Sequence, residues 1–151
     1  MKINSDIFFA EVERLLTESD EVTITIRGNS MLPMLRDGRD GVVLRRYESE
    51  PIRVGDVMLF KYRAGYVLHR VIKIKDEQIT FAGDGNYKIY EQAQRSEIVA
   101  RMVAYVRDGR RVECKDREWQ CYSRLWMALP MIVRRVVLGI QRRIKYKEHG
   151  Y

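Results

Sequence analysis

The chain carries the stretch VTITIRGNSMLP at residues 22–33, and this stretch decides the fold that the sequence predicts. Apolar residues alternate with threonines over residues 22–26, and a two-residue period is typical of a half-buried strand. The strand runs directly into Gly28 and Asn29, which favour a tight turn. Ser30 is therefore predicted to lie on a turn at the end of a strand.

Further short strands are predicted after this turn, with turn residues between them. They cover residues 41–47, 56–62, 66–74, 78–82, 98–107 and 110–114. The turn residues Arg63-Ala64-Gly65 favour a hairpin, and Gly83-Asp84-Gly85-Asn86 is expected to end a strand in a loop. Many short strands with regular turns predict a mainly β fold, built on a partly closed antiparallel β-sheet.

Helices are predicted at both ends of the chain. Residues 5–18 carry apolar side chains at helical spacing, which predicts a short N-terminal helix. From residue 125 onward an apolar stripe is opposed by arginines, which predicts a C-terminal amphipathic helix. Pro130 is expected to start or kink this helix. We therefore divide the chain into a body, residues 1–118, and a basic amphipathic C-terminal helix, residues 119–151.

The composition is that of a globular domain, with 46% hydrophobic and 32% charged residues in a chain of 151. The two cysteines, Cys114 and Cys121, are too few for a disulfide framework or a metal knuckle. No uncharged segment approaches the roughly 18 residues that span a bilayer, and the first residues lack a signal-peptide core. We therefore expect a cytoplasmic protein that is soluble or is attached at most to a membrane surface.

The net charge of +7 is concentrated at the C-terminal end. Residues 119–151 contain seven Lys and Arg residues and one acidic residue, which leaves residues 1–118 nearly neutral. A nearly neutral body argues against a broad nucleic-acid-binding face. The C-terminal helix has two interpretations of similar weight: it packs on the body, or it binds a membrane surface through its apolar stripe and Trp126. A nucleic-acid contact is less favoured.

One serine and one histidine suggest catalysis. A serine hydroxyl is a poor nucleophile until a base within hydrogen-bond reach takes its proton. The chain has two histidines, of which His69 lies in the body and His149 lies close to the C-terminus. An imidazole titrates near neutral pH and suits this task. From the residues alone, His69 is either the base for Ser30 or a structural residue of its strand.

Four segments in a fixed order give this serine and histidine a common context. They read GNSMLP at 28–33, GDVMLF at 55–60, VLHRVI at 67–72 and FAGDGN at 81–86. In this order they resemble the motifs of the signal peptidase and self-cleaving repressor superfamily of serine peptidases, over residues 22–105. The resemblance implies a β-rich peptidase fold in which Ser30 is the nucleophile.

The resemblance also implies which residue is the base. Members of the superfamily use either lysine or histidine, and His69 makes this chain similar to the histidine-type branch. Lys73 and Lys75 are rivals, because a two-residue strand period would place them on the face that carries His69. Within the motif an arginine follows the base directly, and only Arg70 fits that position.

The third catalytic group is also assigned through the resemblance. Asp84 is expected to orient the imidazole of His69 and to stabilise its protonated form. The alternative is that Asp84 only caps its own turn. Histidine-type members often carry a second aspartate a few residues later, and only Glu91 could substitute for it in this chain.

The oxyanion and substrate contacts are expected beside the serine. Signal peptidases often have a serine where this chain has Gly28, so backbone N–H groups, including that of Ser30, are expected to bind the oxyanion. Asn29 and Met31 flank the serine and are the predicted oxyanion and substrate contacts. The apolar residues after Ser30 either line shallow substrate pockets or belong to the core, and the core is favoured for each of them.

Together these features predict a serine endopeptidase that cleaves an extended peptide or leader segment with a Ser–His dyad. Its partner would be a peptide or protein substrate, and no metal or organic cofactor is implied. A self-cleaving regulatory module is one alternative, less favoured because no DNA-binding domain is seen before the fold. A membrane-binding or partner-binding protein of the same fold that has lost catalysis is the other.

Overall fold

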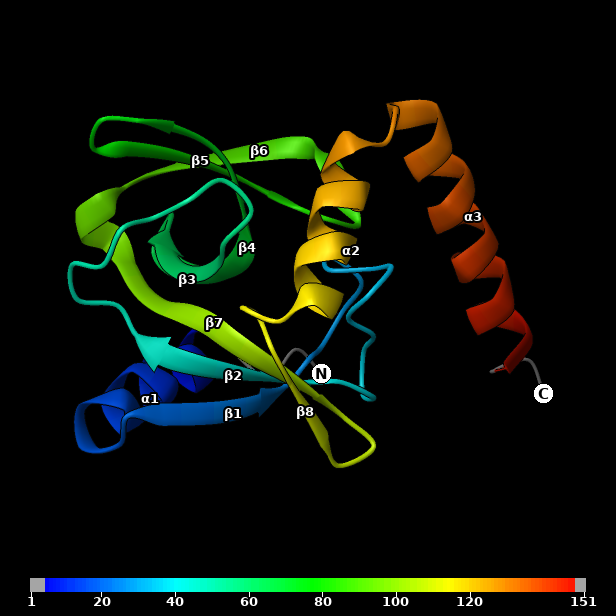
Figure 1. The fold of residues 1–151 in the computed structure, drawn as a ribbon. Helices are drawn as coiled ribbons and strands as arrows, with labels where there is room; N and C mark the ends of the chain where they lie inside the picture. The colour runs from blue at the N-terminus through cyan, green and yellow to red at the C-terminus, as the bar shows by residue number, and fades with distance from the viewer. Residues whose placement is uncertain (1–4, 149–151) are drawn as a thin grey trace.

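A computed structural model describes residues 5–148 as one antiparallel sheet with helices before and after it (Figure 1). The helices are α1 (Ser5–Glu18), α2 (Arg117–Ala128) and α3 (Met131–Glu148), with a short 3-10 helix, η1 (Arg95–Glu97). The strands are β1 (Glu21–Thr25), β2 (Gly41–Arg46), β3 (Val57–Tyr62), β4 (Gly65–Lys75), β5 (Gln78–Gly83), β6 (Asn86–Gln94), β7 (Ile98–Arg107) and β8 (Arg110–Glu113). The architecture is therefore mixed α/β, which corrects the prediction of a mainly β fold.

The strands follow the order β1-β2-β7-β3-β4-β5-β6, and β8 pairs with β7. Register shifts interrupt four of the pairings, and such bulges bend strands. The sheet consequently curls, and Figure 1 shows β3, β4 and β5 above β1, β2 and β7. Among the described strands, β1 and β6 end the path and do not pair with each other. The sheet is therefore open, where partial closure was predicted.

The alternation over residues 22–26 and the turn residues between the later segments predicted seven of the strands to within one residue at each end, and α1 confirms the helix predicted at residues 5–18. The missed strand is β6. Its exposed residues include Ile89 and Tyr90, whereas Glu91 is buried. Since an apolar residue on the solvent face and a charged one on the inner face reverse the usual alternation, the pattern indicated no strand here.

The apolar core has two main parts. In the first, Val12 and Leu16 of α1 pack against β1, β2 and β7 together with Trp119 of α2. The second lies among β3, β4, β5 and β6, where the rings of Phe60 and Phe81 stack with their centroids 3.9 Å apart. Both parts support β4, the strand that carries His69.

The predicted C-terminal helix is divided into two. The backbone of Leu129, between α2 and α3, is extended at φ −69° and ψ 138°. Pro130 explains the break, because its ring disfavours a helical conformation in the preceding residue. The boundary drawn between residues 118 and 119 falls inside α2, and Trp119 packs in the first part of the core.

Candidate functional site

The turn after β1 presents Ser30 at the surface of the sheet. Gly28 has a φ of +83°, a left-handed conformation that glycine adopts without strain. The N–H of Leu32 donates to the carbonyl of Asn29 at 3.2 Å, which closes the turn around the serine. Ser30 itself is half-buried and therefore accessible from one side.

The apolar side chains that follow Ser30 anchor this turn in the protein. Met31, Leu32 and Leu35 are buried, and Met34 is half-buried against the core. These residues are therefore packing residues, as the sequence favoured. Met31 has a second role, because it also lines the groove described below.

The segment that follows Ser30 ends at Asp40, whose buried carboxylate is bonded to arginines. The carboxylate of Asp40 is fully buried and accepts hydrogen bonds from Arg107, Arg39 and the backbone N–H of Arg36. Arg107 also donates to the carbonyl of Met34 at 2.6 Å. Burial alone would raise the pKa of Asp40, but the hydrogen bonds from Arg107 and Arg39 outweigh it and hold that pKa below its usual range.

His69 lies on β4, where the strand passes from a free edge into the sheet. β5 pairs with β4 only from Arg70 onward, so the segment before His69 is paired on one side, with β3. His69 is 7% exposed, whereas Lys73 and Lys75 are both exposed. The register of β4 with β5 shifts between Val71 and Lys73, and neither lysine lines the groove that contains His69.

Two glycines where β5 turns into β6 allow the serine turn to approach the histidine. A Cβ atom added to Gly83 would lie 2.5 Å from the carbonyl oxygen of Ser30 and 2.9 Å from Nε2 of His69. A Cβ atom added to Gly85 would overlap the carbonyl oxygen of Asn29. The N–H of Gly85 donates to the Ser30 carbonyl at 2.8 Å and fixes this contact. The Nε2 edge of His69 therefore faces the turn that carries Ser30.

The other nitrogen of His69 faces Glu91 on β6. Nδ1 lies 3.1 Å from Oε1 of Glu91, and both side chains are 9% exposed. The distance is that of an ion pair once the imidazole is protonated, although no aligned hydrogen bond forms at Nδ1. Oε2 of Glu91 has no hydrogen-bond partner within the described residues. The carboxylate beside the imidazole is thus Glu91, the residue identified as a substitute for the second aspartate.

Asp84 bonds to Arg70 and Tyr122 and not to His69, the partner predicted for it. Its two oxygens accept hydrogen bonds from Nε and NH2 of Arg70, both at 2.7 Å, in a bidentate pair. A third bond, of 2.9 Å, comes from the hydroxyl of Tyr122. The prediction that Asp84 orients His69 therefore does not describe this geometry. Arg70 and Asp84 are 1% and 4% exposed, and a buried carboxylate needs such a partner to remain charged.

α2 completes this buried network. Arg70 donates to the hydroxyl of Ser123 and to the carbonyl of Gly55, both at 2.8 Å. The indole N–H of Trp126 donates to the carbonyl of Asp84 at 3.2 Å. Burial and the charge of Asp84 both raise the pKa of Tyr122, so its phenol stays protonated as a donor. The network therefore fixes the turn at residues 83–85 through α2, with residues that do not line the groove.

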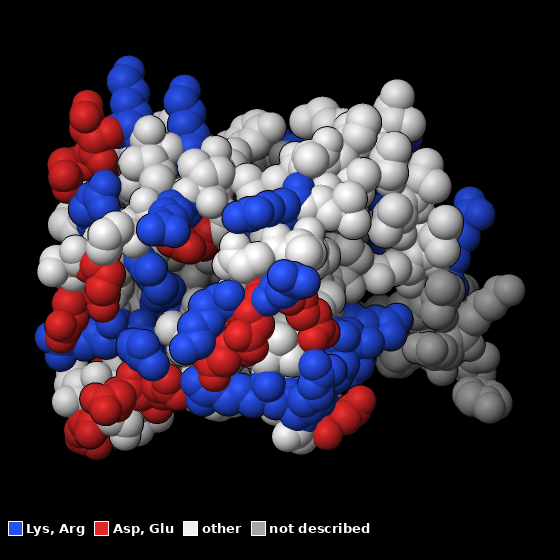
Figure 2. All heavy atoms as spheres, in the orientation of Figure 1, with Lys and Arg blue, Asp and Glu red and all other residues white. Residues whose placement is uncertain are grey.

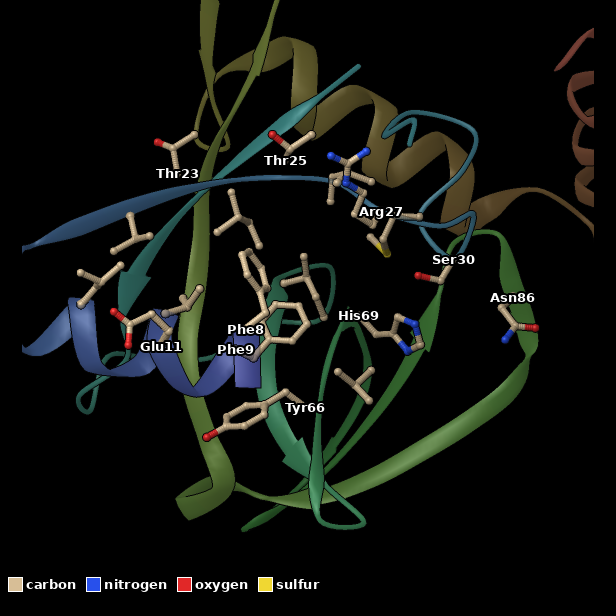
Figure 3. Close-up of a pocket in the computed structure, with 18 residues that line it drawn as sticks. Phe8, Phe9, Glu11, Thr23, Thr25, Arg27, Ser30, Tyr66, His69 and Asn86 are labelled. Carbon is tan, nitrogen blue, oxygen red and sulfur yellow. The ribbon is translucent and has the colours of Figure 1, made fainter. Parts of the chain in front are cut away.

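A groove of about 900 Å³ runs from the Ser30–His69 pair toward α1. Its walls are α1, the free edge of β1 and the free edge of β4. Figure 3 shows Ser30 and His69 together at one end, with the rings of Phe8, Phe9 and Tyr66 further along. In the described part of the chain no hydrogen bond joins Ser30 to His69, and catalytic hydrogen bonds often tighten only when substrate binds.

No family model and no curated protein matches this chain. The resemblance carried by the four motifs therefore remains a prediction.

The structure brings some of the predicted site residues together and separates others. Ser30, His69 and Met31 line the groove, whereas Asn29 is exposed and is not among the described residues that line it. The sequence did not indicate that Asn86 lines the groove or that α1 forms one of its walls. The sequence named Glu91 only as a possible substitute for the second aspartate, and its place beside His69 depends on β6, a strand that was not predicted.

Proposed function

We propose that this protein is a serine endopeptidase in which Ser30 is the nucleophile and His69 is the general base. The observation that carries the proposal is the orientation of the imidazole between two segments. Its Nδ1 lies 3.1 Å from Glu91, and its Nε2 edge faces the turn that carries Ser30. A ring held in this way can accept a proton on the serine side while a carboxylate stabilises its charge from the other side.

In the first half of the reaction the Ser30 oxygen attacks the carbonyl carbon of the scissile peptide bond. The hydroxyl proton passes to Nε2 of His69, and Glu91 stabilises the imidazolium. When the tetrahedral intermediate collapses, the C–N bond breaks and the imidazolium gives its proton to the leaving amine. Water then attacks the ester on Ser30 with His69 again as base, which releases the carboxylic acid and restores the serine.

The oxyanion of each tetrahedral intermediate needs donors that are fixed before the reaction. The backbone N–H of Ser30 supplies one of them, because the turn that holds it is closed by the bond from Leu32 to Asn29 and docked on Gly85. No serine side chain precedes the nucleophile by two residues, since that position is Gly28. The oxyanion site therefore depends on backbone groups.

The groove suits a peptide in an extended conformation. β1 is an edge strand, and the part of β4 before Arg70 has one unpaired side. Both carry backbone N–H and C=O groups that an added strand can pair with. The peptide would lie along this wall with its scissile bond at Ser30, and its apolar side chains would contact Ile24, Leu68 and α1.

Cleavage of a diverse synthetic peptide mixture, read by mass spectrometry, tests this proposal. We expect the wild-type protein to produce new C-terminal carboxylates, and Ser30→Ala to produce none. Ser96→Ala is the matched control, because Ser96 is exposed on η1 and lies outside the groove. Cleavage by Ser30→Ala at the wild-type rate would contradict the proposal, as would a lack of cleavage by the wild type on every peptide that binds in the groove.

A further inference from the structure

α3 has apolar side chains on two of its faces. On the inner face, Leu138 is 4% exposed and packs with Leu32 and Trp126, and Val137 lies against the same cluster. Gln141 adds a polar contact on this side, because its side chain donates to the carbonyl of Pro33 at 3.1 Å. The inner face is therefore the side by which α3 packs on the rest of the protein.

The second apolar face points away from the sheet. Ile132, Val136 and Ile140 are 78%, 55% and 53% exposed, and their spacing of four residues places them in one row along the helix. Met131 and Val133 are exposed beside them. Figure 1 shows α3 as the outermost element of the molecule. An apolar row of this length on a helix already packed on its other side needs a further partner.

The charges of α3 indicate what that partner is. Residues 131–148 contain six basic residues and one acidic residue, Glu148. Within the described side chains, Arg135, Arg142 and Arg143 are exposed. Figure 2 shows a mostly uncharged surface over α2 and the start of α3, with basic side chains at its outer margin. A helix with an apolar row and basic flanks is suited to the boundary between lipid headgroups and acyl chains.

We propose that the outer face of α3 lies flat on a membrane surface that contains anionic lipid. The apolar row would enter the headgroup boundary, and the arginines would contact lipid phosphates. A second copy of this chain is less favourable as the partner, because two strongly basic helices would face each other. In residues 5–148 no helix is long and apolar enough to cross a bilayer.

This surface is connected to the serine turn through the inner face of the same helix. Leu138 contacts the cluster that includes Leu32, and Gln141 bonds to Pro33, two and three residues after Ser30. A helix held on lipid would therefore hold the segment that follows the nucleophile. The lipid contact itself does not depend on whether Ser30 is catalytic.

Co-sedimentation of the full chain with phosphatidylcholine vesicles, with and without phosphatidylglycerol, tests this inference. The test variant is Val136→Glu/Ile140→Glu on the outer face of α3. The matched control is Val54→Glu/Ile89→Glu, which makes the same two changes at residues that are 51% and 54% exposed elsewhere. Circular dichroism verifies that each variant is folded. A second test variant, Arg135→Gln/Arg142→Gln, removes charge without placing acid in the apolar row.

We expect the wild type and the control to sediment with the phosphatidylglycerol vesicles and not with pure phosphatidylcholine. Both test variants should partition at least about tenfold more weakly. Three results would overturn the inference: no binding by the wild type, equal binding to both kinds of vesicle, or equal loss in the control. A wild-type dimer in analytical ultracentrifugation that Val136→Glu/Ile140→Glu converts to a monomer would assign the face to a second copy instead.

Discussion

Nδ1 of His69 and Oε1 of Glu91 lie 3.1 Å apart, with both side chains largely removed from solvent. This pair gives the imidazole a carboxyl neighbour on the side opposite to Ser30. Asp84 cannot take that role in this geometry, because its oxygens are bonded to Arg70 and Tyr122. The two carboxylates therefore have separate neighbours: Glu91 lies beside the histidine, and Asp84 bonds to Arg70 and Tyr122 next to the loop on which the serine turn is docked.

Replacing Glu91 with Gln should reduce catalysis more than stability. The neutral amide keeps the size of the side chain but no longer stabilises the imidazolium, so kcat should fall by about 10- to 1000-fold. KM should change little, because Glu91 is not among the residues that line the groove. Peptide cleavage and thermal unfolding, measured on the same samples, check both parts.

Asp84→Asn is the contrasting variant. It leaves the buried guanidinium of Arg70 without its charged partner, and breaking a buried ion pair costs about 3–5 kcal/mol. We therefore expect a large loss in the free energy of unfolding. If instead Asp84→Asn lowered kcat at unchanged stability while Glu91→Gln left kcat intact, the roles assigned to the two carboxylates would be reversed.

The pH dependence of cleavage distinguishes an imidazole base from a lysine base. A base must be neutral to accept the serine proton, and imidazole in model peptides titrates near pH 6.5. We expect kcat/KM to level off well below the pH at which an ordinary lysine side chain loses its proton. A rise confined to alkaline pH would indicate a lysine such as Lys73 and contradict the role of His69.

Gly83→Ala tests the close approach of the serine turn to the histidine. The new methyl group would lie 2.5 Å from the carbonyl of Ser30 and 2.9 Å from Nε2 of His69, so the turn has to shift. We expect loss of cleavage and destabilisation of about 1–3 kcal/mol. Gly139→Ala on α3 is the control, because open space surrounds that position. It should keep full activity and equal or higher stability, since alanine favours a helix.

Asp40→Asn should weaken the protein in a pH-dependent way. The folded protein holds the pKa of Asp40 below its usual range, so this carboxylate stabilises the fold above its unfolded pKa. The contribution is lost as the pH falls through the lower, folded pKa. Urea unfolding at pH 7 should show a loss of about 1–3 kcal/mol in the variant. The difference from wild type should shrink below about pH 4, and a difference that grew there would be inconsistent with this assignment.

The sequence predicted most of the fold because most strands are short segments separated by turn residues. Thr23 and Thr25 alternate with apolar residues in β1, and β4 lies between the turn residues Arg63-Ala64-Gly65 and Lys75-Asp76-Glu77. β6 was missed because Tyr90 is exposed and the adjacent Glu91 is buried, which reverses the usual alternation. Openness of the sheet could not be inferred either, since it depends on how far the bulges bend the strands and not on any local pattern.

The candidate site was predicted in part. Ser30 and His69 were identified from their motifs, and the structure places them at one end of a common groove. The partners of Asp84 could not be deduced, because Arg70 meets it through the pairing of β4 with β5, and Tyr122 meets it through the packing of α2 on the sheet. Asp84, which the motif predicted as the partner of His69, therefore bonds to Arg70, the residue that follows His69 in sequence.

The central claim is that His69 activates Ser30, and covalent labelling with a fluorophosphonate probe measures this most directly. At neutral pH the wild type should gain one adduct, mapped by mass spectrometry to Ser30, and Ser30→Ala should gain none there. His69→Ala should label far more slowly than the wild type, because the serine loses its base. Labelling of His69→Ala at the wild-type rate, or an adduct on another serine in place of Ser30, would contradict the account.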